Sequence, residues 1–225
     1  MAKAAAVAAK AATGGSGEAI GNVIKAAGAT AATGGEAASV NGIASGIKGI
    51  VEAAEKAGEE GKLNAAGAAG GAANANAGKL FAKKNNQGGA AADAGKAAAA
   101  VSAVSGEQIL KAIVDAAKGG DKTGVNDVKD ATNPIDAAIG STEQNADAAA
   151  FANEMKKDDQ IAAAMVLRGM AQGGQFALKN ADHANAKGTV KNAVESAIKE
   201  INGWLEEMAK AAAVAAKAAT GGSGE

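Results

Sequence analysis

The sequence contains no cysteine among its 225 residues. This absence excludes disulfide bonds, thiolate metal ligands and a thiol nucleophile within the segment, and it leaves no cysteine here for lipid attachment. Tyrosine is also absent, and proline, histidine, arginine and tryptophan each occur once. The residue types from which most catalytic and metal sites are built are therefore scarce.

Aromatic side chains make up only 2% of the residues, as three Phe and one Trp. The net charge is −1, from 23 basic and 24 acidic residues that are well interspersed. A nucleic-acid-binding surface needs a basic face and usually aromatic side chains on which bases stack. We therefore expect no nucleic-acid partner.

The sequence also lacks a long, strongly apolar run. The first ten residues, MAKAAAVAAK, have no apolar core of the kind that a signal peptide carries. The longest uncharged stretch, Leu63 to Gly78, consists mostly of Ala, Gly and Asn. That composition does not suit a membrane span.

Alanine and glycine are abundant instead, at 67 and 32 positions. Alanine is the best helix former, so the composition predicts an all-α protein. Each buried alanine removes little apolar area from water, so the core has to be assembled from thin, closely packed helices.

One stretch, residues 155–179, is expected to form the centre around which the rest of the chain packs. Seven consecutive apolar residues, Ile161 to Leu167, lie between Asp158-Asp159 and Gly173-Gly174. Three alanines in the run, the acidic pair before it and the glycine pair after it favour a helix. A helix that is apolar all round is covered by other helices. We therefore predict a central buried helix.

Four further helices have clear sequence signals. From Glu36 onward, apolar residues recur at spacings of three and four, which places them on one face. Ser105 opens a capping-box pattern, and Asn133-Pro134 marks another helix start. Thr189 is predicted to cap a long helix that continues to Ala219.

Three shorter helices are predicted with weaker signals. Lys3 to Ala12 and Lys96 to Val104 are alanine-rich segments. A third short helix is expected to begin at Ser16 or Gly17 and to run through Ile20, Val23 and Ile24. Between all these helices lie five polar segments rich in Ala, Gly, Asn and Asp, and we predict surface loops there, near 59–78, 82–95, 118–130, 141–153 and 180–187.

Few residues are candidates for catalysis or for binding a metal or cofactor. His183 has no second histidine or cysteine beside it, so we interpret it as a solvated loop residue. Arg168 follows the apolar run, and we expect it to pair with a carboxylate at the edge of the core. Asp158-Asp159 are interpreted as first-turn helix charges, and residues 119–123 resemble a phosphate loop only superficially. We predict no catalytic, cofactor-binding or metal-binding residues, no cofactor, and no enzymatic activity.

An exact repeat bounds the sequence. Residues 1–18, MAKAAAVAAKAATGGSGE, recur unchanged at 208–225. A structural repeat would recur many times at a short period and would tolerate drift. Identity at the two ends favours a DNA cassette bounded by direct repeats, and the alternative is a cloning artefact. We predict one domain, residues 1–225, bounded by this repeat.

Six blocks of the sequence are distinctive. They are MKKDDQIAAAMVLRGMAQGGQFALK at 155–179, SVNGIASGIKGIVEAAEKAG at 39–58, NANAGKLF at 74–81, AVSAVSGEQILKAIVDAA at 100–117, ATNPIDAAIG at 131–140 and TVKNAVESAIKEINGWLEEM at 189–208. Together they resemble the variable large protein and Vls family of surface lipoproteins of Borrelia spirochaetes. The block at 155–179 is similar to the family's most constant segment, a target of host antibodies.

The resemblance implies a variable surface antigen for immune evasion. In that family, silent cassettes donate sequence by gene conversion to one expressed locus, and constant helices present changeable loops to host antibodies. The implied fold is an elongated helical bundle whose variable loops are the five polar segments. The implied location is the cell outer membrane, as a surface-exposed lipoprotein whose signal and lipid-bearing cysteine lie outside this segment.

Two other functions stay open at this point. One is an adhesin that binds host glycosaminoglycan or another tissue ligand, which a lysine cluster on one folded face would favour. The other is a structural coat protein with invariant loops. The oligomeric state is also open, because an Ala/Gly-rich helix face suits contacts within one chain and contacts between subunits equally.

Overall fold

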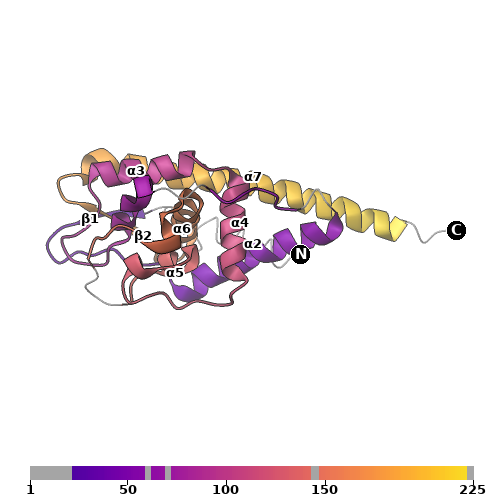
Figure 1. Cartoon of the computed structure of the whole chain (residues 1–225), viewed down its shortest axis with the longest axis horizontal. Coiled ribbons are helices and arrows are strands. Elements are labelled where there is room, and N and C mark those ends of the chain that lie inside the picture. The colour runs from indigo at the N-terminus through magenta and orange to yellow at the C-terminus, as the bar shows by residue number, and fades with distance from the viewer. Residues whose placement is uncertain (1–21, 59–61, 69–71, 143–146, 222–225) are drawn as a thin grey trace.

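The structure, a computed structural model, describes residues 22–58, 62–68, 72–142 and 147–221. Within these residues the fold is helical, as the composition predicts, apart from one small sheet (Figure 1). The α-helices are α2 (Ala37–Ala57), α3 (Ala91–Ser102), α4 (Gly106–Ala117), α5 (Pro134–Ile139), α6 (Asp158–Met170) and α7 (His183–Gly221). The 3-10 helices are η2 (Ala72–Phe81), η3 (Val128–Asp130) and η4 (Asn153–Lys156).

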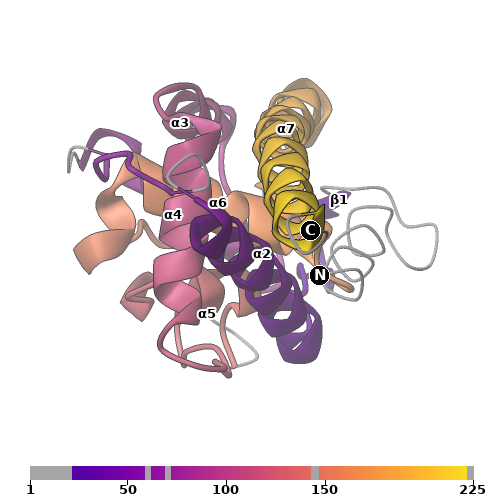
Figure 2. The ribbon, with the colours of Figure 1, turned by 90° about the vertical axis from the view of Figure 1, so that its right-hand side faces the viewer.

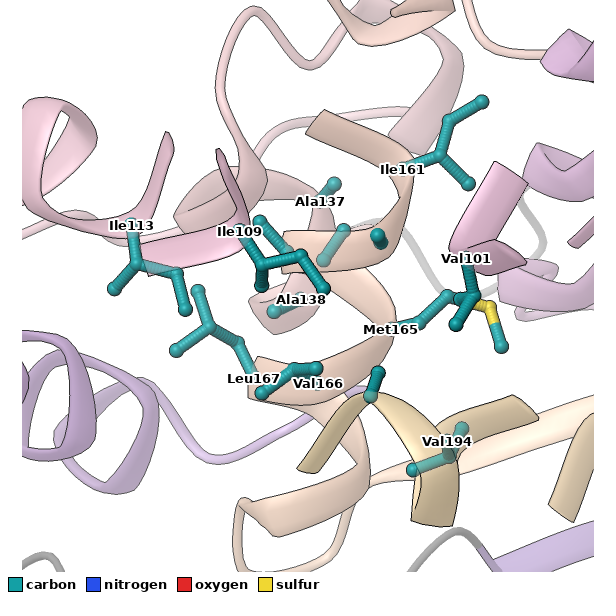
Figure 3. Close-up of a cluster of buried hydrophobic side chains, with 14 of the residues drawn as sticks. Val101, Ile109, Ile113, Ala137, Ala138, Ile161, Met165, Val166, Leu167 and Val194 are labelled. Carbon is teal, nitrogen blue, oxygen red and sulfur yellow. The ribbon is translucent and has the colours of Figure 1, made fainter. Parts of the chain in front are cut away.

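Helix α6 forms the centre of the molecule, which confirms the predicted buried helix. Every residue from Ile161 to Met170 is buried, and α2, α3, α4, α5 and α7 all pack against it. Figure 3 shows Leu167 directed toward Ile113 of α4, and Met165 beside Val101 of α3. The alanines in this helix let its neighbours approach closely, so one thin helix is covered on all sides.

Helices α2 and α7 form a long pair along one side of the molecule. They pack against each other, and α7 continues past the rest of the fold toward the C-terminus (Figures 1 and 2). At 39 residues, α7 is about 58 Å long. The predicted apolar stripe is buried at Val190, Val194, Ile201 and Met208, while Trp204 is only partly buried. The second copy of the repeat is therefore helical as far as Gly221, and the first copy lies outside the described residues.

The predicted start of α7 at Thr189 is wrong. The helix begins six residues earlier, at His183, because the amides of Asn185 and Ala186 already donate to the carbonyl oxygen of Asp182. The intervening residues include three with high helix propensity, which extends the helix toward its N-terminus. The predicted polar loop at 180–187 is thus a loop over its first few residues only.

A two-stranded parallel sheet joins the start of the described chain to the segment that follows α6. β1 (Asn22–Ala26) pairs with β2 (Gln175–Lys179), and Val23 lies opposite Phe176. The prediction of a helix through Val23 and Ile24 is therefore wrong. Val and Ile favour strands, and the partner strand lies about 150 residues away, so no local pattern announces the pairing. The predicted helix at Lys3 to Ala12 lies outside the described residues.

The helix starts predicted at Ser105 and at Asn133-Pro134 are confirmed. Ser105 accepts a hydrogen bond from the amide of Gln108, and the Gln108 side chain accepts one from the amide of Ser105, which completes the capping box of α4. Asn133 accepts from the amides of Ile135 and Asp136 at the start of α5. These side chains satisfy amides that a helix leaves unpaired in its first turn.

Arg168 lies in the last turn of α6 and is 1% exposed. Its Nε donates to the carbonyl oxygen of Ala138 at 3.0 Å, and its guanidinium carbon lies 4.5 Å from the centre of the Phe81 ring. A Cβ added at Gly34 would lie 3.2 Å from Nη2, and a Cβ at Gly140 would overlap that atom. We call Gly34, Phe81, Ala138 and Gly140 the Arg168 cradle.

The prediction that Arg168 pairs with a carboxylate is wrong for the residues that the structure describes. Burial alone lowers the pKa of Arg168 to about 9, with no contribution from an acidic neighbour, so the side chain stays charged at neutral pH. Among the described atoms, Nη1 has no hydrogen-bond partner. A carbonyl at the C-terminal end of α5 and the face of an aromatic ring take the place of the carboxylate.

The three phenylalanines of the chain meet beside this cradle. The Phe81 ring centre lies 5.1 Å from that of Phe151 and 5.4 Å from that of Phe176, which it meets edge-on. All three side chains are at most 2% exposed. Because they come from η2, the segment before η4 and β2, this cluster ties together parts of the chain that are far apart in the sequence.

We expect Arg168→Ala to destabilise the protein by about 3 kcal/mol or more, because it removes the packing of a large buried side chain and leaves a cavity. Arg168→Met should cost much less, because it keeps most of the volume and removes a buried charge without a carboxylate partner. Urea unfolding of the two variants checks this difference. Equal losses in both variants would mean that the charge itself holds the cradle together.

Gly140→Ala should destabilise the fold by about 2 kcal/mol or more, because residue 140 has φ +86° and its new Cβ would overlap the Arg168 guanidinium. The matched control is Gly42→Ala, within α2, where an added Cβ meets nothing within 4 Å. There the greater helix propensity of alanine should stabilise the protein by up to about 1 kcal/mol. Thermal unfolding should separate the two variants in opposite directions from the parent.

Candidate functional site

The residues considered as possible catalytic or ligand-binding groups make contacts that stabilise the fold. Asp158 accepts a hydrogen bond from the Asn74 side chain at 3.0 Å, and Asp159 accepts one from the amide of Ala68 at 3.1 Å. Both carboxylates lie in the first turn of α6, as predicted, where they favour the helix N-terminus. Across the described part of the chain, no group of three His, Asp or Glu residues is arranged to hold a metal ion.

His183 is not the solvated loop residue that the sequence predicts. It is the first residue of α7, it is half-buried, and its Nε2 lies 3.1 Å from the carbonyl oxygen of Val23. The imidazole therefore joins the start of α7 to the outer side of β1. The contact depends on the strand pairing, which the sequence did not reveal.

The segment that resembles a phosphate loop is bound to α2. The Asn41 side chain donates to the carbonyl oxygen of Lys122 at 2.7 Å and accepts from its amide at 3.0 Å. The Lys122 ammonium donates to the carbonyl oxygen of Gly119 at 3.0 Å, within the same turn. These contacts occupy the amide and the ammonium group of Lys122, two groups that a phosphate site in this segment would use.

The remaining candidate is the surface formed by the five polar segments. Their described residues include runs that are exposed, such as Asn85-Asn86, residues 118–121 and residues 180–181. Residues 59–61, 69–71 and 143–146 of these segments lie outside the described residues. The sheet and α3, which adjoin several of the segments, lie at the end of the molecule opposite the C-terminus (Figure 1).

The polar segments are not loops throughout, which corrects the prediction. α3 begins at Ala91 rather than Lys96, because the Asp93 carboxylate accepts a hydrogen bond from the amide of Ala90 at 2.8 Å. Residues 72–78 belong to η2, and Asn74, Ala75 and Ala77 among them are buried. Each segment also carries at least one buried residue that attaches it to the core: Ala77, Ala94, Val128, Phe151 and Ala186.

No single described helix is long and apolar enough to cross a membrane. One pair, α3 with α4, meets the length and composition criteria together, and the two helices are bent by 97° at the break between them.

Comparison with known proteins identifies relatives. A family model described as Borrelia lipoprotein matches residues 1–212. The chain is 34% identical over 128 residues to variable large protein 4 of Borrelia hermsii, covering 48% of this chain and 35% of that protein. It is 37% identical over 127 residues to variable large protein 17 of the same organism, covering 55% of this chain and 35% of that protein.

A solved structure also matches. The crystal structure of the Lyme disease variable surface antigen VlsE of Borrelia burgdorferi superposes with a TM-score of 0.82 at 46% identity, covering 96% of this chain and 76% of that one. The matched part spans about a third of the length of the two variable large proteins. Because the family model matches nearly the whole sequence, the chain belongs to the Borrelia lipoprotein family.

Proposed function

We propose that this chain is the variable domain of a surface antigen that serves immune evasion by antigenic variation. Constant helices keep the fold, and the exposed parts of the polar segments change what host antibodies bind. The similarity to the variable large proteins and to the variable surface antigen VlsE supports this function. On this proposal the domain acts by display, without a cofactor and without catalysis.

One structural observation carries the proposal. The residues that define the fold, above all residues 161–170 of α6 together with Phe81 and Ala138 of the Arg168 cradle, are buried. The exposed residues of the polar segments, such as Asn85 and Asp121, contribute little to that core. Substitutions at such exposed positions usually change the free energy of unfolding by less than about 0.5 kcal/mol. The surface can therefore change while the fold persists.

We further propose that the protein is held at the cell outer membrane by a lipid anchor outside this segment. Membership of the Borrelia lipoprotein family supports this location. The C-terminal end of α7 would face the membrane, because the sheet and the neighbouring polar segments lie at the opposite end of the molecule (Figure 1). Antibodies approaching from outside would then meet those segments first.

The adhesin alternative has weaker support. A glycosaminoglycan site needs a face of uncompensated basic side chains. Several lysines of the polar segments instead lie close to carboxylates: Lys84 with Asp147 at 2.5 Å and Lys129 with Asp127 at 2.7 Å. These pairings reduce the positive potential that such a ligand would meet.

Sequencing the coding region from many clones of one source under antibody selection tests the main proposal. We expect substitutions to gather at exposed positions of the polar segments and to spare residues 155–179. We also expect the buried residues of those segments, such as Val128 and Phe151, to remain unchanged, because a substitution there would open a cavity. Clones from growth without antibodies provide the control. Substitutions spread evenly over buried and exposed positions would contradict antigenic variation.

The burial of α6 generates a second prediction. Antibodies raised against a peptide of residues 158–170 should bind the denatured protein but bind the folded protein weakly or not at all, because residues 161–170 are buried in the fold. Antibodies raised against residues 118–130 serve as the control and should bind both forms. Comparable binding of both antibodies to the folded protein would show that the α6 surface is accessible without unfolding.

A further inference from the structure

The polar segment 62–68 is held in place although it forms no helix or strand. The side chain of Glu107, in the first turn of α4, accepts hydrogen bonds from the amides of Asn64 at 2.6 Å and Ala65 at 2.9 Å. Both amides meet the same oxygen, Oε1. One carboxylate thus fixes two successive peptide groups of the segment, with the strength that hydrogen bonds to a charged acceptor have.

Two further side chains of the helices hold the same segment. Gln108 donates from Nε2 to the carbonyl oxygen of Ala66 at 2.9 Å, while its Oε1 completes the capping box of α4. Asp159, which is 4% exposed in the first turn of α6, accepts from the amide of Ala68 at 3.1 Å. Four backbone groups within five residues are therefore bound by side chains of α4 and α6.

A second polar segment is held in the same way. Asn41 of α2 bonds to both the amide and the carbonyl oxygen of Lys122, at 3.0 and 2.7 Å. This reciprocal pair imitates the backbone pairing of a strand, and neither bond uses the lysine side chain. The two segments have different sequences, yet in both of them a polar side chain from a helix binds the backbone.

Contacts to the backbone do not depend on which side chain the bound residue carries. Asn64, Ala66 and Gly67 are exposed, so their side-chain positions face solvent. A Cβ added at Gly67 would make an ordinary contact of 3.4 Å with Asp159 Oδ2. Leu63 and Ala68 are partly buried and pack against the core, so the freedom applies to the residues between them.

We propose that Glu107, Gln108, Asp159 and Asn41 form a sequence-independent clamp: they grip the backbone of changeable segments so that the exposed side chains can be replaced without loss of loop shape. The inference rests on the proposed function, because it treats these segments as the ones that change. Beyond that function, the clamp identifies which helix residues would hold a loop whatever the sequence of the loop.

Amide hydrogen exchange, measured by NMR on the full chain, tests the clamp. In Glu107→Ala, the amides of Asn64 and Ala65 should exchange faster by roughly tenfold to a hundredfold, while the amide of Lys122 keeps its rate. In Asn41→Ala, the amide of Lys122 should exchange faster, while the amides of Asn64 and Ala65 keep their rates. Glu195→Ala on α7 removes the same charge at an exposed position, so it should change none of these rates.

A loop-replacement variant supplies the decisive comparison. The combined change Asn64→Ser, Ala66→Thr and Gly67→Ser should leave the exchange rates of amides 64, 65 and 68 within about threefold of the parent. If this variant loses protection as Glu107→Ala does, or if Glu107→Ala changes no rate, the clamp is refuted. The rate of the Leu110 amide, in the core of α4, separates loss of the clamp from loss of the fold in every variant.

These rates are independent of whether the segments vary among clones. A clone survey that shows no change in the polar segments would overturn the proposed function and leave the measured clamp in place. Protection that depends on the loop's own side chains would overturn the clamp and leave antigenic variation untouched. The two proposals can therefore fail separately.

Discussion

The burial of one charged side chain constrains the whole centre of this molecule. The guanidinium of Arg168 has no carboxylate partner among the described residues, so a helix-end carbonyl, an aromatic face and two glycines must lie close around it. These groups come from the segment before α2, from η2, from α5 and from the turn after α5. Displacing the Ala138 carbonyl or the Phe81 ring would remove part of the compensation of the buried charge, and an uncompensated buried charge is among the largest costs a single side chain can impose.

Around this centre, the fold assigns stability and tolerance of substitution to different residues. The alanine-rich helices pack closely and provide a core with little volume to spare, which resists change. Each polar segment inserts buried residues, from the small Ala186 to the large Phe151, and leaves other positions, such as Asn85 and Asp121, exposed to solvent. Stability thus depends on the buried positions of each segment, and the exposed positions between them are free of that requirement.

The sequence predicted what depends on neighbours in the chain. The apolar run of α6, the cap at Ser105 and the start at Asn133-Pro134 are local patterns with a direct physical cause, and they were found. The pairing of β1 with β2, the surroundings of Arg168 and the buried residue in each polar segment depend on contacts across the fold, and they were missed. The five segments were placed from composition, but composition cannot distinguish Val128, which is buried, from the exposed residues around it. The contacts of the clamp side chains with the loop backbone also depend on the fold, and Asp159 was interpreted from the sequence only as a first-turn helix charge.

The uninterrupted course of α7 into the second copy of the repeat, as far as Gly221, has a geometric consequence. A continuous helix transmits rotation: each residue inserted or deleted would turn the domain by about 100° and shift it by about 1.5 Å relative to the far end of the helix. An exchange of sequence at a repeat of constant length preserves both the angle and the distance. On the proposed function, it is thus the constant 18-residue length of the repeat that would keep each exchanged version of the domain facing the same way.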